Sequence, residues 1–112
     1  MNVTQHEIVC PKRLVILGST GSIGTQALEV VDRLGYAVSA LAAGSNDRLL
    51  EDQIRRFRPK AAAVFDEKAA AALRVRTRDL SVRILSGMDG LCELAALEEA
   101  DLVLNAVVGM VG

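Results

Sequence analysis

The feature that most constrains this chain is an apolar run that ends in three closely spaced glycines. Residues 13–17 read RLVIL, and Gly18, Gly21 and Gly24 follow at a GxxGxxG spacing. A continuous apolar run is typical of a strand that is buried on both faces, as in a parallel sheet. Glycine directly after such a strand allows a sharp turn. The pattern therefore predicts a strand–turn–helix unit near the start of an α/β domain.

The residues after the glycines have the spacing of an amphipathic helix that ends near residue 34. Apolar residues recur at i, i+4, i+7, i+8 and i+11, which places them on one helix face. The residues of this predicted face are Ile23, Ala27, Val30, Val31 and Leu34. Gly35 follows at the position of a C-terminal cap, where a left-handed backbone favours glycine.

The rest of the chain continues the alternation of short apolar runs and helical patterns. The predicted elements are strands at 37–42, 61–65, 82–85 and 101–108 and helices at 46–57, 67–76 and 88–98. The predicted helix faces are Leu50, Ile54 and Phe57 in the second helix and Leu91, Leu94, Ala95 and Glu98 in the last. Strands that alternate with helices need crossover connections. We therefore expect an α/β fold, a Rossmann-like doubly wound parallel sheet with helices on both faces.

The last residues bear on domain organisation. The chain stops at Gly112 directly after an apolar strand, whereas chain ends are usually polar. We therefore expect a polar lead-in at 1–11 and an incomplete domain at 12–112, truncated after about the fifth strand of a longer protein.

The glycine turn lies where a dinucleotide-binding domain holds the phosphates of its cofactor. One glycine allows the sharp turn, another lets the backbone approach a pyrophosphate, and a third lets the helix pack closely on the sheet. The free N–H groups of the helix start face the anion, and the hydroxyls of Thr20 and Ser22 add donors. The common fingerprint is GxGxxG, so the alternative is a tight turn that binds nothing.

The end of the second strand indicates which dinucleotide is preferred. Domains that bind NAD usually place Asp or Glu there to hold the ribose 2′-hydroxyl. This chain instead has Gly44, Ser45 and Asn46 with Arg48 close by, a group that suits a 2′-phosphate and favours NADP. Asp47 either turns outward or repels that phosphate. The alternative is that Ser45 and Asn46 are only helix caps.

Composition excludes several other classes of protein. Hydrophobic residues make up 51% of the chain, which excludes intrinsic disorder. Aromatic residues make up only 3% and the net charge is -1, which argues against binding of nucleic acid or of an anionic membrane. The longest uncharged run, 14–28, is shorter than the ~20 apolar residues of a membrane span. Residues 1–11 lack the apolar core of a secretory signal.

Cysteines and known motifs point to no further chemistry. Cys10 and Cys92 form no CxxC pair, so we expect neither a zinc site nor a disulfide framework, and a reducing cytoplasm is the expected compartment. The chain contains no HExxH, calcium-loop or nucleophile-elbow motif. His6, the single histidine, lies in the polar lead-in. We therefore assign no catalytic residue and no metal ligand.

Three segments carry a resemblance to a known family. They are RLVILGSTGSIG at 13–24, AAGSN at 42–46 and LNAVVGMVG at 104–112. Together they resemble the 1-deoxy-D-xylulose 5-phosphate reductoisomerases, over residues 12–112. The resemblance implies the NADPH-binding part of an oxidoreductase that converts 1-deoxy-D-xylulose 5-phosphate, a phosphorylated sugar, to 2-C-methyl-D-erythritol 4-phosphate in non-mevalonate isoprenoid (terpenoid) biosynthesis. It also implies a homodimer and a divalent metal, Mg or Mn, that polarises the substrate's carbonyl.

The resemblance further implies which residues contact the cofactor. The implied residues are Thr20, Gly21, Ser22 and Ile23 at the phosphates and Gly44, Ser45 and Asn46 around the ribose and its 2′-phosphate. Many members of the family have Lys at the position of Ser45, so Arg48 is the candidate that supplies the missing charge. Gly109 and Gly112 match a segment that passes close to the cofactor.

The family's other functional residues have no counterpart among these 112 residues. Its acidic metal ligands, its substrate-phosphate residues and its mobile loop lie beyond position 112. We therefore expect that the 112-residue chain alone does not catalyse the reaction. Two alternatives are the cofactor domain of another NADP-dependent reductase, such as a semialdehyde dehydrogenase or a short-chain epimerase, and a stand-alone nucleotide-binding module.

Overall fold

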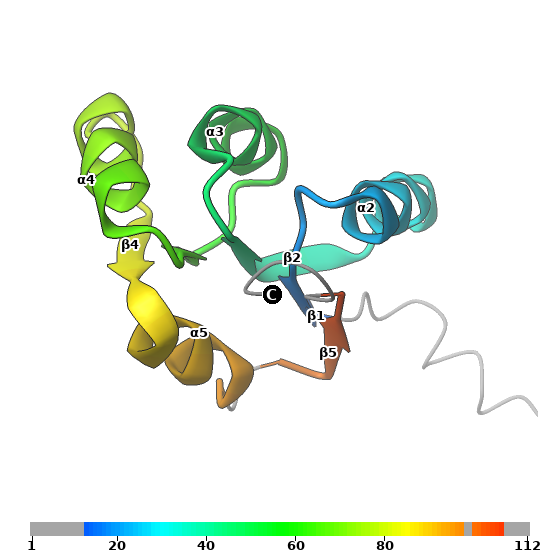
Figure 1. The fold of residues 1–112 in the computed structure, drawn as a ribbon. Helices are drawn as coiled ribbons and strands as arrows, with labels where there is room; N and C mark the ends of the chain where they lie inside the picture. The colour runs from blue at the N-terminus through cyan, green and yellow to red at the C-terminus, as the bar shows by residue number, and fades with distance from the viewer. Residues whose placement is uncertain (1–12, 98–99, 107–112) are drawn as a thin grey trace, which may run out of the picture.

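The computed structural model describes residues 13–97 and 100–106, and within them strands and helices alternate along the chain (Figure 1). The elements are β1 Arg13–Leu17, α2 Ser22–Leu34, β2 Ala37–Ala43, α3 Asp47–Phe57, β3 Ala61–Val64, α4 Glu67–Arg76, β4 Arg83–Ser86, α5 Gly87–Ala95 and β5 Leu102–Asn105. This order confirms the predicted alternation. The predicted lead-in at 1–11 and positions 98, 107, 108, 109 and 112 lie outside the described residues.

The strands form one parallel sheet in the order β4-β3-β2-β1-β5. The chain moves outward from β1 to β4 and then returns to place β5 on the other side of β1. Helices α2, α3 and α4 cover one face of the sheet and α5 covers the other (Figure 1). The predicted α/β, doubly wound fold is therefore confirmed.

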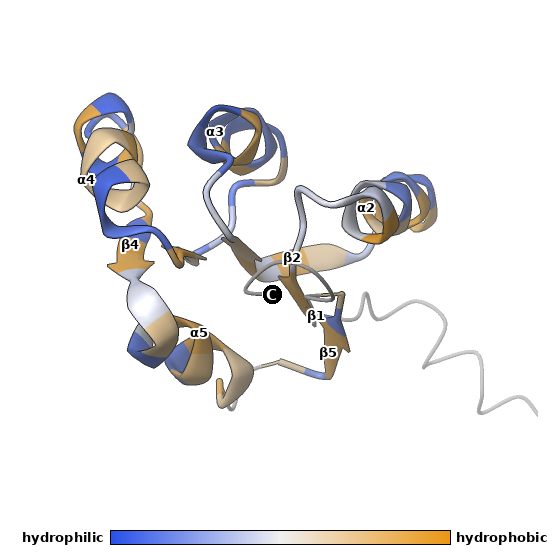
Figure 2. Ribbon diagram, in the orientation of Figure 1, coloured by the Kyte–Doolittle hydropathy of each residue, from blue (hydrophilic) through white to orange (hydrophobic). Residues whose placement is uncertain are grey.

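Two apolar layers hold the helices to the sheet, and strand alternation separates them. In β1, Leu14 and Ile16 belong to the layer with α2, α3 and α4, whereas Val15 and Leu17 belong to the layer with α5. All four are buried. In Figure 2 the central strands are mostly apolar, and α2 and α3 turn polar residues away from the sheet. A strand buried on both faces explains why RLVIL is a continuous apolar run.

The predicted buried face of α2 is confirmed at Val31 but wrong at three other positions, because the helix is rotated about its axis. Ile23, Val30 and Leu34 are 60%, 46% and 56% exposed. The residues that α2 buries are Gly24, Leu28 and Val31. A Cβ at Gly24 would lie 2.7 Å from the Cα of Ser19 and closer still to the carbonyl oxygen of Gly18. The close contact at Gly24 therefore sets the rotation of α2 about its axis. Glycine counts as neutral in an apolar pattern, yet here it determines which face of the helix is buried, and Ile23, Val30 and Leu34 do not.

The other predicted helix faces hold with one exception. Leu50 and Ile54 are buried in α3 and Phe57 packs against the same layer. In α5, Leu91 and Leu94 are buried, but Ala95 is exposed at the last turn. Gly90 instead lies on the buried face of α5, and a Cβ there would be 2.9 Å from the Cβ of Leu85.

The predicted caps of α2 and α3, which depend on residues close in the chain, are confirmed. Gly35 caps α2 with φ 75°, and its N–H donates to the carbonyl oxygens of Asp32 and Val31. Asn46 caps α3, because its side-chain oxygen accepts from the N–H of Leu49 at 3.2 Å. The described residues include no helix that is both long and apolar enough to span a bilayer.

Candidate functional site

The glycine turn lies at the carboxyl end of β1, between the two strands that flank it. Leu17, the last residue of β1, pairs with Ala42 of β2 on one side and with Asn105 of β5 on the other. The chain runs in opposite directions from β1 to reach these two neighbours. The carboxyl edge at such a switch point is where open α/β sheets bind ligands.

The first glycine of the turn is required by the backbone itself. Gly18 has φ 87°, a left-handed conformation that favours glycine. The N–H groups of Gly18 and Ser19 both donate to the carbonyl oxygen of Ala42 at 2.8 Å. The turn is therefore tied to the carboxyl end of β2, so that it does not depend on a ligand for its shape.

The other two glycines of the motif differ in what a side chain would meet. A Cβ at Gly24 would strike the backbone of Gly18 and Ser19. A Cβ at Gly21 would meet only the carbonyl oxygen of Gly18, at an ordinary distance of 3.6 Å, and the φ of Gly21 is -79°. The fold thus requires Gly18 and Gly24, whereas Gly21 is exposed and its backbone is open to an external group.

The start of α2 is the least neutralised helix start among those described. Its N-cap, Gly21, provides no side-chain hydrogen bond, and its first turn contains no acidic residue. By contrast, Asn46 and Asp66 cap α3 and α4 through their side chains, and α5 has Asp89 in its first turn. The first N–H groups of a helix have no partner within the helix and carry its positive dipole end. The start of α2 is therefore suited to an anion.

The predicted phosphate residues surround this helix start. Thr20 is half-buried in the turn, while Ser22 and Ile23 are exposed in the first turn of α2. The apolar side chain of Ile23 is exposed and belongs to neither apolar layer of the core.

A buried polar pair, which sequence reasoning missed, holds the turn to α3. The hydroxyl of Ser19 donates to Oε1 of Gln53 at 2.7 Å, and Nε2 of Gln53 donates to the carbonyl oxygen of Ser19 at 2.9 Å. Both residues are buried. The signal that could have revealed the pair is a glutamine between Leu50 and Ile54, on the apolar stripe of α3.

The second predicted turn lies on the same edge of the sheet, after β2. Gly44 is half-buried, and its carbonyl oxygen accepts from the N–H of Asp66 at 2.9 Å. Ser45 and Asn46 are exposed, and Asn46 is a helix cap as the alternative interpretation supposed. Since β1 and β2 are neighbours, the structure brings the two predicted groups of residues to adjacent positions on one edge.

Asp47 points away from this second turn. Its Oδ2 accepts from Nη2 of Arg76, in the last turn of α4, at 2.6 Å. That hydrogen bond lowers the pKa of the Asp47 carboxyl, so the group is ionised and paired at neutral pH. The Asp47 carboxylate therefore turns neither to open solvent nor to an unpaired position, but to Arg76 of the neighbouring helix. Arg48 is exposed in the first turn of α3.

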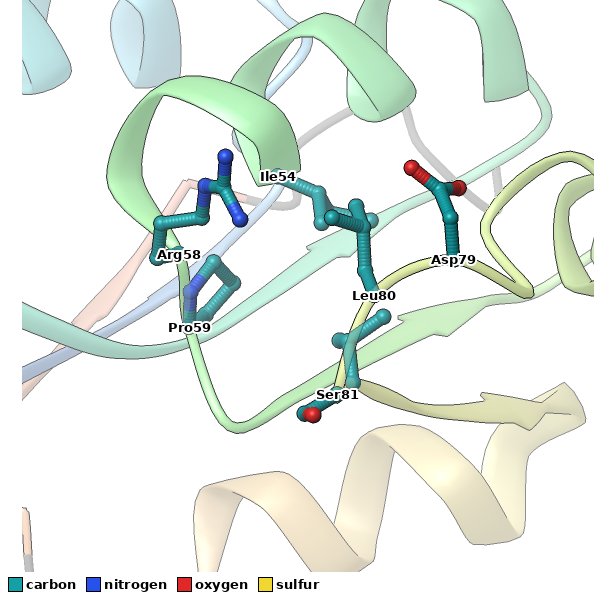
Figure 3. Close-up of a pocket in the computed structure, with 7 residues that line it drawn as sticks. Ile54, Arg58, Pro59, Asp79, Leu80 and Ser81 are labelled. Carbon is teal, nitrogen blue, oxygen red and sulfur yellow. The ribbon is translucent and has the colours of Figure 1, made fainter.

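One hollow in the described surface lies away from the glycine turn. A pocket of about 280 Å³ lies between the end of α3 and the start of β4, lined in part by Arg58, Pro59 and Ser81 (Figure 3). These residues precede β3 and β4, so the pocket is at the amino edge of the sheet, opposite the glycine turn. The described residues also contain no group of three or more His, Cys, Asp or Glu side chains that could hold a metal.

Comparison with known proteins agrees with the family resemblance in the sequence. A model of the family described as 1-deoxy-D-xylulose 5-phosphate reductoisomerase matches residues 14–112. The chain is 50% identical over 103 residues to the reductoisomerase of Halothermothrix orenii, covering 90% of this chain and 27% of the relative. It is 55% identical over 102 residues to that of Lachnoclostridium phytofermentans, covering 90% of this chain and 26% of the relative.

Solved structures of such enzymes share the fold. The enzyme from Zymomonas mobilis in complex with NADPH superposes with a TM-score of 0.77 at 34% identity, over 83% of this chain and 25% of that one. A reductoisomerase in complex with NADPH, fosmidomycin and magnesium gives a TM-score of 0.77 at 33% identity, over 82% and 23%.

The chain thus spans about a quarter of the length of the relatives it matches. Within that quarter the match extends over nearly every residue, from the first strand to position 112. The chain belongs to the 1-deoxy-D-xylulose 5-phosphate reductoisomerase family.

Proposed function

We propose that this chain forms the NADPH-binding part of an enzyme that converts 1-deoxy-D-xylulose 5-phosphate to 2-C-methyl-D-erythritol 4-phosphate in non-mevalonate isoprenoid biosynthesis. The observation that carries the proposal is the start of α2, which has no side-chain cap. The fold itself does not require glycine at position 21, because a Cβ there would have room. A tight turn that bound nothing would need Gly18 and Gly24 but would tolerate a side chain at position 21.

The residues present fit the pyrophosphate of such a cofactor. The backbone from Thr20 to Ile23 would donate N–H groups to the phosphates, and the exposed hydroxyl of Ser22 would add a donor. When bound, NADPH supplies the hydride for the reductive step. The role of the turn is to hold the anionic part of the cofactor, and the Ser19–Gln53 pair keeps the turn in place for it.

The second turn would hold the ribose and the 2′-phosphate. Gly44 leaves room for the ribose, and exposed Ser45 and Asn46 would donate to the phosphate oxygens. Arg48 lies two residues further on and would supply the positive charge that many family members place at position 45. Under this proposal the domain covers residues 12–112.

The remaining parts of the reaction belong to the whole enzyme. We propose Mg or Mn as the metal, since a related structure is described with magnesium, and its ligands are not among the described residues. A homodimer follows from the family resemblance. We also propose a cytoplasmic location, supported by the exposed free thiol of Cys92, because a reducing compartment keeps such a thiol unpaired.

The proposal is tested by cofactor binding at the protein's natural full length, followed by NADPH fluorescence. We expect NADPH to bind more tightly than NADH, and oxidation of NADPH to require 1-deoxy-D-xylulose 5-phosphate. The variant Gly21→Val should keep its melting temperature within a few degrees, because its Cβ has room. It should lose at least about tenfold in NADPH affinity, since the backbone can no longer approach the pyrophosphate.

Two results would contradict the proposal. One is NADPH affinity in Gly21→Val equal to that of the unaltered protein, which would place the phosphates elsewhere. The other is oxidation of NADPH, dependent on the sugar phosphate, by the isolated 112-residue chain, which we expect to be inactive.

A further inference from the structure

We infer that Arg76 is a positioning residue for cofactor choice: it holds the carboxylate of Asp47 away from the second turn, so that this turn accepts the extra phosphate of NADPH. The inference rests on the proposed function, because it supposes that the 2′-phosphate lies at Gly44, Ser45 and Asn46. It adds a residue from the last turn of α4, which lies outside both turns in the sequence.

The position of Asp47 makes its charge important. It is the first residue of α3 and follows the Asn46 cap, and its N–H donates to the carbonyl oxygen of Ser45 at 2.9 Å. Its backbone is therefore part of the turn. An unpaired carboxylate here would lie close to a doubly charged phosphate and repel it. It would also offer the acceptor that NAD-binding domains use for the ribose 2′-hydroxyl.

The contacts of Arg76 prevent this. Its Nη2 donates to Oδ2 of Asp47 and its Nε donates to Oε1 of Glu51, both at 2.6 Å. The two carboxylates are four residues apart and so lie one above the other on α3. The side chains of Asp47, Glu51 and Arg76 are only 21%, 20% and 29% exposed, so solvent screens the contact less than at an open surface.

The backbone of Arg76 is itself held to α3 by Arg55. Nη2 of Arg55 donates to the carbonyl oxygen of Arg76 at 2.9 Å, and Nη1 of Arg55 donates to Asp79 at 3.0 Å. The backbone that carries Arg76 is therefore anchored to α3 independently of Asp47. A planar guanidinium that is held at two edges restrains the direction of the Asp47 side chain as well as neutralising it.

The experiment compares dissociation constants for NADPH and NADH in the full-length protein. Arg76→Met keeps the length of the side chain but removes its charge. We expect it to weaken NADPH binding by about tenfold and to leave NADH binding unchanged or tighter, because only NADPH carries the repelled phosphate. The double variant Arg76→Met with Asp47→Asn should recover most of the NADPH/NADH ratio, since no carboxylate is left to repel the phosphate.

Arg56→Met is the matched control. It makes the same exchange elsewhere on α3 and removes the ion pair of Arg56 with Asp32 of α2, but leaves the contact of Asp47 with Arg76 intact. We expect it to keep the NADPH/NADH ratio of the unaltered protein. If Arg76→Met melts too low to assay, Arg76→Gln replaces it, because its amide can still donate to Glu51.

The outcomes separate this inference from the proposed function. If the unaltered protein binds neither cofactor, the proposed function is wrong. If it binds NADPH but Arg76→Met weakens both cofactors equally, or the double variant does not recover the ratio, Arg76 only stabilises α3 against α4 and the inference is overturned.

Discussion

The two turns of the candidate site are built in different ways. The β1–α2 turn presents backbone: Gly18 sets its shape, Gly24 admits the helix, and the start of α2 has no side-chain cap. The β2–α3 turn presents side chains: Asn46 caps α3, and the charge of Asp47 is balanced from α4. A backbone site is visible in the sequence as a glycine pattern. A side-chain site depends on charges brought from elsewhere, and its specificity is not visible in any one segment.

The largest expected effect that tests this contrast between the two turns is at Gly24. Gly24→Ala places a Cβ against the backbone of Gly18 and Ser19, which cannot move without loss of their hydrogen bonds to Ala42. We expect a loss of about 3 kcal/mol in the free energy of unfolding, measured by urea denaturation. Gly21→Ala is the control and should lose far less. Equal losses would mean that the motif is purely structural.

The next largest effect is expected at the link between the first turn and α3. Gln53→Leu leaves the buried hydroxyl and carbonyl of Ser19 without their partner. We expect a loss of about 2–3 kcal/mol in the free energy of unfolding and weaker NADPH binding. Gln26→Leu makes the same exchange at an exposed position of α2 and should change neither quantity. A stable Gln53→Leu protein would show that the turn does not need α3.

The pH dependence of stability tests the second turn. The hydrogen bond from Arg76 lowers the pKa values of Asp47 and Glu51 in the folded protein. The folded state therefore binds fewer protons than the unfolded state, and this stabilisation is present above the unfolded values and lost as the pH falls through the folded ones, below about 4. Arg76→Met should show a shallower loss of stability between pH 6 and pH 3 in urea titrations.

The control for this measurement is another ion pair. Arg83→Met removes the contact of Arg83 with Glu93, whose side chains are 64% and 49% exposed. It should retain the acid sensitivity of the unaltered protein. An identical acid profile in Arg76→Met would mean that the two carboxylates are not coupled to Arg76 in solution.

The smallest expected effect concerns Ser45. Ser45→Lys adds a positive charge to an exposed position of the second turn. Because exposed ion pairs contribute little, we expect NADPH to bind roughly threefold more tightly, with NADH unchanged. Ser81→Lys adds the same charge at the opposite edge of the sheet and should have no effect. Equal gains for both cofactors would place the 2′-phosphate away from position 45.

Most elements of the fold could be predicted because their signals are local. The continuous apolar run of β1, the caps at Gly35 and Asn46 and the alternation of strands and helices each depend on residues close in the chain. The prediction of the α2 face was wrong because it weighted the apolar side chains of Ile23 and Leu34, whereas a backbone contact at Gly24 orients the helix.

The sequence by itself determined the order of strands and helices, the position of the glycine turn and the family to which the chain belongs. Only the tertiary structure decided how α2 is rotated, that Gln53 holds the turn, and that Asp47 is turned toward Arg76. The partners in the last two contacts are 34 and 29 residues apart in the chain. The physical reason is that a hydrogen bond or an ion pair depends on distance in space, whereas strand, cap and turn preferences depend on distance along the chain.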